Sequence, residues 1–407
     1  MNKLTVDDLI SKDQIKDKRV LIRVDFNVPL NKEGEITDPK RINESLATIS
    51  AISIRGGKCI LMSHLGRPKG EVNEKYSLRV AAEYLSNILG KPVLFADDCI
   101  GENNARTIEN MGRGDILLLE NLRFYKEEEK NDTEFAKKLA SYGDIFINDA
   151  FGTAHRAHAS TEGVTHFIDI CAAGYLMKKE LDYLADAVNN PVRPFCAILG
   201  GSKISGKIDV IESLMNKADT ILIGGGMMFT FYKALGWNIG KSILEDDKVE
   251  LAKEILNKAK EKNKKILLPV DIVIADKFDN SAQTKTIKAD SMSSDNNEWM
   301  GMDIGPKSIE LFRKEILGSK TIVWNGPMGV FEMQNFAAGT NEIATALAEA
   351  TENGAITIIG GGDSASAIAQ AGLEDKVSHV STGGGASLEF LEGKKLPGVE
   401  ALNDVSK

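Results

Sequence analysis

Short runs of β-branched and other apolar residues alternate with helical patterns along the whole 407-residue chain. This alternation is typical of α/β proteins, in which crossover helices join parallel strands. In the first half we expect strands at 20–24, 60–62, 93–95, 116–119 and 145–147, with helices at 41–54 and 78–89. In the second half we expect strands at 195–199, 220–223, 266–268, 272–274, 321–324, 356–359 and 378–380. The pattern predicts an α/β fold of doubly wound, Rossmann-like parallel sheets.

The chain is too long for one ordinary hydrophobic core, so we expect two domains. A single helical pattern at 174–194, ending in a proline-containing break, separates the two series of strands. We therefore predict a first domain over 1–173, a linker helix with a hinge over 174–194, and a second domain over 195–391. Residues 392–407 belong to neither sheet and have the composition of a tail.

Composition excludes several classes of function. The net charge of -9 and the pI near 5.3 argue against a nucleic-acid partner, which needs a positive face. No stretch of about 18 apolar residues is present, so we expect no membrane span. The four cysteines are scattered without a C-x-x-C pair, and the first residues lack a signal-peptide core. These features indicate a cytoplasmic protein without disulfides.

Positive side chains follow the predicted strands of the first half, although the chain as a whole is acidic. Ligands of open parallel sheets bind at the carboxyl ends of the strands. The residues found there are Asp25, Asn27, His64, Arg67, Arg123, His155, Arg156 and His158, and Arg41 begins the first crossover helix. Because guanidinium groups bind phosphate and carboxylate bidentately, we expect a site for a small molecule that carries both. Asp25 and Asn27 could contact a hydroxyl group of that molecule.

The histidines in "HRAH", His155 and His158, have the i, i+3 spacing of a metal pair. No third ligand lies nearby in the sequence, which disfavours zinc. A general base remains an alternative, but donation of hydrogen bonds to an anion or support of the loop fits the segment better. His166 and His379 are isolated, and we expect them to be structural.

Glycine-rich turns follow the predicted strands of the second half, at 199–208, 223–229, 359–366 and 381–387. Glycine at a strand-to-helix turn lets backbone N–H groups approach phosphate oxygens at the helix N-terminus. Several such turns in one sheet predict a nucleotide-phosphate site. Gly201 to Lys207 has the spacing of a P-loop, but Ile208 stands where that motif needs a hydroxyl for Mg²⁺. Lys203 and Lys207 can nevertheless reach phosphates.

Two carboxylates near these turns have assignable roles. Asp363 follows three glycines at a predicted helix start, where it could hold Mg²⁺, cap the helix, or do both. Glu332 ends the proline- and glycine-containing loop 323–332, and a carboxylate there could accept from ribose hydroxyls. Together the two halves suggest phosphoryl transfer.

A non-catalytic binding protein and a nicotinamide oxidoreductase are the two alternatives to a phosphotransferase. A binding protein that closes on an anion without chemistry explains the arginines but not the glycine turns or Lys203. A nicotinamide oxidoreductase needs G-x-G-x-x-G with an acid about 20 residues later, and none of the turns has that spacing.

Seven strings carry a resemblance that runs nearly end to end: "RVDFNVPL", "SHLGRPKG", "LLENLRFYKEE", "NDAFGTAHRAHAS", "GGSKISGKIDVI", "WNGPMGVFE" and "GGGDSASA". In this order they resemble the phosphoglycerate kinase family. The resemblance implies a usually monomeric, hinge-bending phosphotransferase with a carboxyl group as acceptor, which converts 1,3-bisphosphoglycerate and MgADP to 3-phosphoglycerate and MgATP. It also implies that residues 392–407 pack on the first domain.

The resemblance further implies the site residues. Those for the triose phosphate are Asp25, Phe26, Asn27, Arg41, His64, Leu65, Gly66, Arg67, Arg123 and Arg156. Those for the nucleotide are Lys207, Gly301, Asn325, Pro327, Glu332, Gly361, Gly362, Asp363 and Ser364, with Asp363 at the Mg²⁺. Arg41 and Lys203 match the catalytic residues that neutralise the phosphoryl group in flight. Gly206 departs from the family, which often has an acid there.

Overall fold

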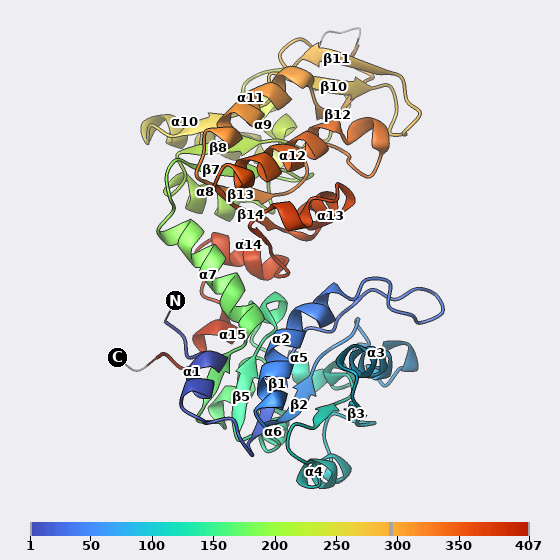
Figure 1. Ribbon diagram of the computed structural model, residues 1–407. Helices are drawn as coiled ribbons and strands as arrows, with labels where there is room; N and C mark the ends of the chain where they lie inside the picture. Colours follow the sequence, from blue (N-terminus) through green and yellow to red (C-terminus); the bar gives the residue numbers. More distant parts are fainter. Residues whose placement is uncertain (1, 293–295, 406–407) are drawn as a thin grey trace. The chain divides into compact units, whose positions relative to one another are not determined.

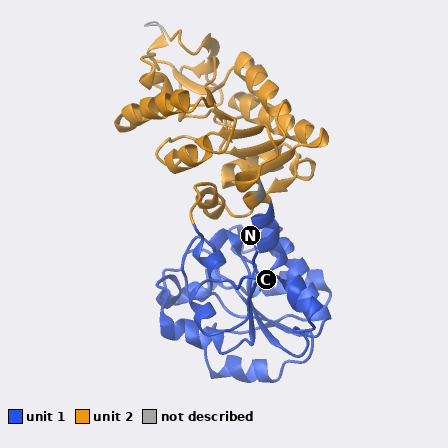
Figure 2. Ribbon diagram, turned by 90° about the vertical axis from the view of Figure 1, so that its left-hand side faces the viewer, with its two compact units in different colours: residues 1–182, 395–407 blue, residues 183–394 orange. Residues whose placement is uncertain are grey.

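The computed structural model describes residues 2–292 and 296–405. These residues form two compact units, coloured separately in Figure 2. Unit 1 comprises Met1–Asp182 and Lys395–Lys407, and unit 2 comprises Tyr183–Lys394. Each unit contains a parallel sheet, as the strand and helix pattern predicted.

The sheet of unit 1 has the order β3-β4-β2-β1-β5-β6, with every pair of neighbours parallel. Its strands are β1 (Arg19–Arg23), β2 (Lys58–Met62), β3 (Leu94–Phe95), β4 (Ile116–Leu118), β5 (Ile145–Asn148) and β6 (Cys171–Ala173). Its connecting helices are α2 (Lys40–Ile54), α3 (Arg79–Leu89), α4 (Glu102–Glu109), α5 (Lys126–Glu129) and α6 (Thr133–Ala140). The strand order changes direction between β1 and β5, which is where such sheets bind ligands.

Register places the ends of three strands of unit 1 at one level. Arg23, the last residue of β1, pairs with Met62 of β2 and with Asn148 of β5. Below this edge, apolar strand residues pack against α2 in one buried cluster, and α2 contributes Ile49 and Ile52 to it. The loops that leave these strands therefore start from a rigid, buried base.

Residues 395–407 belong to unit 1. The Leu4 N–H donates to the Asn403 carbonyl across 2.8 Å, and Asn148 Nδ2 donates to the Gly398 carbonyl across 3.0 Å. Figure 1 shows α15 (Pro397–Glu400) next to α1 (Val6–Ser11). This segment is therefore held on the first sheet by hydrogen bonds to its backbone.

The parallel sheet of unit 2 has the order β15-β14-β13-β7-β8-β9. Its strands are β7 (Phe195–Leu199), β8 (Thr220–Ile223), β9 (Lys265–Leu267), β13 (Thr321–Asn325), β14 (Ile356–Gly360) and β15 (His379–Val380). Its helices are α8 (Ile208–Met215), α9 (Met228–Ala234), α10 (Val249–Glu261), α11 (Pro306–Leu317), α12 (Ala338–Glu352), α13 (Gly362–Gln370) and α14 (Gly385–Leu391). The switch point lies between β7 and β13.

The strand expected at 272–274 does not join this parallel sheet. It is β10 (Asp271–Ala275), the central strand of an antiparallel sheet in the order β11-β10-β12, with β11 (Thr284–Lys288) and β12 (Met300–Ile304). Only residues 268–270 separate β10 from β9, which is too short for the helical crossover between parallel strands. Figure 1 shows these strands grouped apart from β7, β8 and β13.

The helix expected within 174–194 is α7 (Tyr175–Asn189), and it contains the boundary between the two units. Its start is held by Asp149, whose Oδ1 accepts from the N–H groups of Leu176 and Met177 at 2.9 and 3.2 Å. The helix ends just before Pro191, as its sequence predicts.

Candidate functional sites

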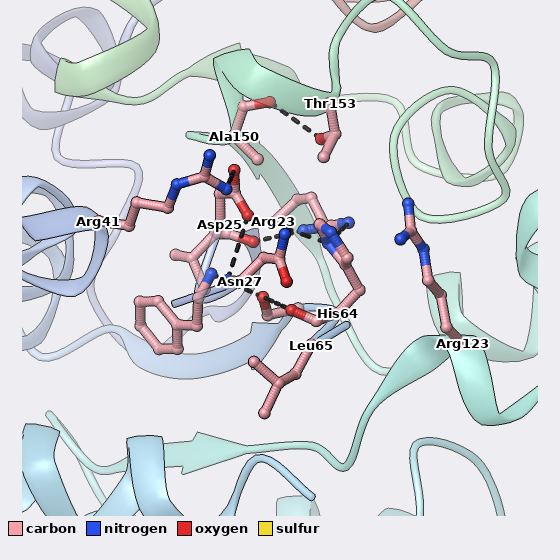
Figure 3. A network of polar contacts seen from close by, with 12 residues as sticks. Arg23, Asp25, Asn27, Arg41, His64, Leu65, Arg123, Ala150 and Thr153 are labelled. Carbon is pink, nitrogen blue, oxygen red and sulfur yellow. Dashed lines mark hydrogen bonds and ion pairs between the residues drawn. The ribbon is translucent and has the colours of Figure 1, made fainter. Parts of the chain in front are cut away.

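Loops at the strand ends of unit 1 carry a group of arginine and histidine side chains, which we call the arginine basin. It comprises Arg41 of α2, His64 and Arg67 after β2, Arg123 of η2 (Leu122–Phe124) after β4, and Arg156 after β5. Figure 3 shows Arg41, His64 and Arg123 around Asp25 and Asn27, which follow β1. These residues come from separate connections of one sheet, as the sequence predicted.

Asp25 orients Arg41 in this basin. Arg41 Nη1 donates to Asp25 Oδ2 across 2.8 Å, while the Asn27 N–H donates to Oδ1 across 3.3 Å. The Asp25 side chain is only 8% exposed, whereas that of Arg41 is 38% exposed. The guanidinium group is therefore anchored on one side and open to solvent on the other.

The loop after β2 is fixed by hydrogen bonds from neighbouring elements. The Gly66 N–H donates to Asn27 Oδ1 across 2.8 Å, and the Gly66 carbonyl accepts from Arg123 Nη1 across 3.0 Å. Asn121 Nδ2 donates to the Leu65 carbonyl across 2.7 Å. These bonds hold the backbone beside His64 in one conformation.

Burial and neighbouring positive charges lower the pKa of two residues of the basin. The pKa of His64 lies well below its usual value, because burial and the charges of Arg23, Arg123 and Arg41 disfavour protonation. Burial lowers the pKa of Arg123, and the charge of Arg156 lowers it further against the opposing effect of Glu129. The Arg156 side chain is exposed, and its charge still reaches Arg123.

Some predicted residues have a different environment. The side chains of Phe26 and Leu65 lie in the hydrophobic core of unit 1, so they support the basin from beneath. The Arg67 side chain is exposed at the surface of its loop.

The loop after β5 contains His158, whose side chain is buried. Burial, followed by the charges of Arg23 and Arg123, lowers the pKa of His158 to about 3. A neutral ring of this kind suits support of the loop. Across residues 2–292 and 296–405 we find no group of three His, Cys, Asp or Glu side chains that could hold a metal ion.

The glycine turns of unit 2 surround a cavity of about 340 Å³. Its lining includes Gly200 and Gly201 after β7, Gly326 after β13, Gly361 and Gly362 after β14, and Gly384 and Gly385 after β15. A side chain on Gly200 would place its Cβ 2.1 Å from the Pro327 carbonyl oxygen, and Gly361 has a φ of +87°. Both positions thus require glycine.

Lys207 and Asn325 face each other in this cavity. Lys207 Nζ donates to Asn325 Oδ1 and lies 3.4 Å from the Asn325 carbonyl oxygen. Asn325 Nδ2 is buried and has no hydrogen-bond partner within the described residues. An unused amide donor beside a lysine, in a ring of glycine turns, suits an anionic ligand.

Lys203 also lines this cavity, and its side chain is exposed. The loop that carries it is tied down by Glu245, whose Oε2 accepts from the N–H groups of Ile204 and Ser205 at 2.5 and 3.1 Å. Lys203 therefore combines a fixed backbone with a solvent-exposed ammonium group.

A second cavity of about 470 Å³ adjoins the glycine turns. Apolar side chains form much of its wall, including Met228, Phe229, Phe278, Met300, Met302 and Met328. Gly301 of β12 lines it too, and a Cβ there would lie 2.0 Å from the Phe229 ring. Pro327, Glu332 and Asp363 complete the set, and Asp363 lines both cavities. The arrangement suits a flat apolar group joined to an anionic one.

Comparisons with known proteins match this architecture over nearly the whole chain. The family model described as phosphoglycerate kinase matches residues 7–394. The chain belongs to the phosphoglycerate kinase family. The phosphoglycerate kinase of Chloroherpeton thalassium is 62% identical over 404 residues, covering 99% of this chain and 100% of the relative. That of Chlorobaculum tepidum is 58% identical with the same coverage.

Solved structures of phosphoglycerate kinases share the fold. The structure from Coxiella burnetii has a TM-score of 0.89 at 40% identity, and that from Pyrococcus horikoshii has 0.81 at 32%. Each covers 98% of both chains. The chain is thus a phosphotransferase of the family that acts with a carboxyl group as acceptor. Among the helices described, we find none with the length and apolar content to cross a membrane.

Three residues near these candidate sites could not be predicted from the sequence. Arg23 is one of two arginines that flank the apolar residues of β1, and Glu128 stands in an acidic run that is typical of an exposed helix. Both side chains are fully buried. Glu245 lies 38 residues beyond Lys207, and no local pattern links it to that loop.

Proposed function

We propose that this chain transfers a phosphoryl group reversibly between 1,3-bisphosphoglycerate and MgADP, giving 3-phosphoglycerate and MgATP. The observation that carries the proposal is that the two units have different sites: one has an arginine basin, and the other has a cavity of about 340 Å³ lined by glycine turns beside an apolar cavity. A kinase for a small phosphorylated acid needs both.

We assign the triose acid to the arginine basin. Arg67, Arg123 and Arg156 bring guanidinium groups suited to phosphate and carboxylate oxygens. Asp25 and Asn27 lie where they can contact the hydroxyl group, and the backbone at Gly66 is already held by Asn27 and Arg123. Arg41 and His64 complete the assignment.

We assign the nucleotide to unit 2. The ring of the base fits the apolar cavity beside Gly301 and Pro327, and Glu332 suits the ribose hydroxyls. The phosphates fit the turn from Gly361 to Ser364, where α13 begins, together with Lys207 and Asn325. The Ser364 hydroxyl already accepts from the Gly326 N–H across 2.6 Å, which fixes one turn against the next.

Mg²⁺ is expected with the nucleotide, and the residues present fit it. Asp363 offers an exposed carboxylate where the two cavities adjoin, and oxygen is the ligand that Mg²⁺ prefers. A bound Mg²⁺ would neutralise phosphate charge. No other acid is required, because Mg²⁺ usually keeps waters and phosphate oxygens in its shell.

The chemistry needs charge stabilisation rather than a proton acceptor. In the ATP-consuming direction the nucleophile is a carboxylate, whose ordinary pKa of about 4 leaves it ionised at neutral pH. Arg41 and Lys203 are the groups we assign to the transferring oxygens, since both have charged heads exposed to solvent. His64 is excluded as an acid because its depressed pKa leaves it neutral.

Transfer also requires the two bound ligands to meet in line with water excluded. We propose that domains 1–173, with 392–407, and 195–391 close about 174–194 during each cycle. Each unit carries a whole ligand site, which suits action as a monomer. The four cysteines are free and buried, which suits a reducing cytoplasm.

The proposal is tested by incubating the chain with labelled ATP, Mg²⁺ and 3-phosphoglycerate. We expect formation of the acyl phosphate, which hydroxylamine converts to a hydroxamate with release of labelled phosphate, only when all three components are present. Binding of both ligands without transfer would instead favour the alternative of a closing, non-catalytic binding protein.

A further inference from the structure

Beneath the arginine basin lies a buried chain of polar groups that the proposed mechanism does not use. Arg23, fully buried at the end of β1, sends Nη2 to within 3.2 Å of His64 Nδ1, as drawn in Figure 3. Its Nε donates to Ser160 Oγ across 2.8 Å, and its Nη1 donates to the Val24 carbonyl. Each of the three nitrogens of this guanidinium group therefore has a polar contact within the protein.

Glu128 anchors the other end of the chain of contacts. Ser160 Oγ donates to Glu128 Oε1 across 2.5 Å, and the Ser160 N–H donates to Oε2 across 3.0 Å. A hydroxyl group has one proton, so Ser160 must give it to Glu128 and accept from Arg23. The buried carboxylate and guanidinium are thus joined through one hydroxyl group.

The contact between Arg23 and His64 has only one consistent proton arrangement. A guanidinium group donates at every nitrogen and accepts at none, so Nδ1 must be the acceptor. A neutral imidazole that accepts at Nδ1 carries its proton on Nε2. We propose that Arg23 is a positioning residue that locks His64 as the Nε2–H tautomer, so that the ring presents a donor to the acid bound in the basin.

The surroundings of the ring agree with this assignment. Asp25 Oδ1 is the competing acceptor for a proton on Nδ1, but it lies 3.9 Å away, beyond hydrogen-bond distance. Both Asp25 oxygens also accept from other groups, namely the Asn27 N–H and Arg41. The depressed pKa of His64 keeps the ring neutral, as the lock requires.

The other ring nitrogen remains available. Within residues 2–292 and 296–405, no protein group is hydrogen-bonded to His64 Nε2. A proton fixed on His64 Nε2 would give a bound anion a neutral hydrogen-bond donor. It would add no further positive charge to the arginine basin. The benefit for phosphoglycerate binding rests on the proposed function, whereas the tautomer itself does not.

The direct test is the ring tautomer in the full-length chain, observed with ¹⁵N-labelled histidine by two-dimensional NMR at neutral pH. His64→Gln identifies the His64 signals by their loss. We expect an unprotonated Nδ1 and a protonated Nε2. A protonated Nδ1 in the unaltered chain would overturn the proposal. Since no catalysis is measured, this failure is distinct from a failure to transfer phosphate.

Variants test whether Arg23 is the cause. Arg23→Met should give a mixture of tautomers and raise KM for 3-phosphoglycerate about tenfold, the factor for one hydrogen bond to a charged group, with KM for ATP unchanged. Arg23→Lys, which retains a donor, should restore part of the Nε2–H population. An unchanged tautomer in a folded Arg23→Met chain would overturn the positioning role.

A second variant covers the case in which Arg23→Met fails to fold. Ser160→Ala keeps both charges and removes only the bridging hydroxyl, so it should let Arg23 shift and admit some Nδ1–H. Ser86→Ala is the control, because it removes a hydroxyl group that donates to the Lys91 carbonyl elsewhere in unit 1. A pure Nε2–H signal in Ser160→Ala would show that Glu128 does not hold Arg23 in place through Ser160, and would overturn that part of the proposal.

A double-mutant cycle separates action through the ring from a general loss of charge. If Arg23 acts through His64, Arg23→Met should raise KM for 3-phosphoglycerate by a smaller factor in a His64→Ala background than in the unaltered chain. Equal factors in both backgrounds would show that Arg23 acts without the ring.

Discussion

Lys207 Nζ donates to Asn325 Oδ1 from within the cavity formed by the glycine turns. Burial lowers the pKa of Lys207 to about 8, although Asp363 and Glu392 oppose the shift. In the free protein Lys207 therefore loses its proton about two pH units earlier than an ordinary lysine does.

This pKa makes nucleotide binding depend on pH. A bound polyphosphate favours charged Lys207, so the free protein must be protonated to bind well. Because the pKa is depressed, the charge is present at pH 7 and is lost as pH rises through 8. We expect Kd for MgADP, measured calorimetrically, to rise up to about tenfold between pH 7 and 9. Lys207→Gln should bind more weakly and show a flat profile. A constant Kd in the unaltered chain would refute this role.

Lys203 should matter to the chemical step. Its exposed ammonium group stands on a loop tied to Glu245, where it can follow the transferring oxygens. Lys203→Ala is expected to lower kcat by roughly 10²–10³-fold, the usual loss for one such donor. Steady-state kinetics measure kcat, and Lys253→Ala, which changes an exposed lysine of α10, serves as the control. Wild-type kcat in Lys203→Ala would remove the residue from catalysis.

Arg156 should affect one substrate only. The side chain is exposed beside the buried Arg123, on the edge assigned to the triose acid. Arg156→Ala should raise KM for 3-phosphoglycerate by about 10-fold or more and leave ATP affinity nearly unchanged. Arg106→Ala, a surface arginine of α4 paired with Glu102, serves as control. Equal effects on both substrates would contradict the assignment.

Gly301 gives the reciprocal test in unit 2. A Cβ at this position would meet the Phe229 ring at 2.0 Å and crowd the apolar cavity. Gly301→Ala should therefore raise KM for ATP several-fold while KM for 3-phosphoglycerate stays the same. Gly318→Ala adds a methyl group at ordinary contact distance, 3.4 Å from the Lys314 carbonyl oxygen, and should change neither constant.

Asp149 should make the start of α7 sensitive to pH. Burial raises its pKa to about 6, against the opposing hydrogen bonds from Thr48, Met177 and Leu176. The folded state therefore holds this proton more tightly than the unfolded state. Stability falls as pH rises from about 4 to 6, by up to about 3 kcal/mol, and stays lower above that window.

Asp149→Asn should remove this dependence and slow the opening of residues 175–182 at pH 7. Hydrogen exchange, corrected for its intrinsic pH dependence, measures that opening. Asp182→Asn changes an exposed carboxylate of the same helix that pairs with Lys178, and it should behave as the unaltered chain does. Identical profiles for Asp149→Asn and the unaltered chain would disprove the assigned pKa.

Much of the fold could be predicted because parallel strands are buried on both faces and read as apolar runs. The same property made strand ends easy to find, and so His64 and Arg123 could be placed on one edge. β11 could not be predicted, since "TKTIK" is largely exposed and lacks an apolar pattern. β6, "CAA", is too short and small to stand out.

The parts of the sites that could not be predicted depend on tertiary contacts. Arg23 is the charged residue within the strand expected at 20–24, and only the structure shows its guanidinium buried against Ser160 and His64. The apolar cavity needs β12, whose strand the sequence pattern did not suggest. Local patterns thus identify the residues of each loop but not the groups that hold them.

A crystal structure of the chain with 3-phosphoglycerate and a non-hydrolysable MgATP analogue tests the central claim most directly. The account predicts the acid against Arg123 and Arg156, and the nucleotide phosphates at the turn from Gly361 to Ser364. A nucleotide bound among the arginines of unit 1, or a glycine-turn cavity without phosphate, would contradict it.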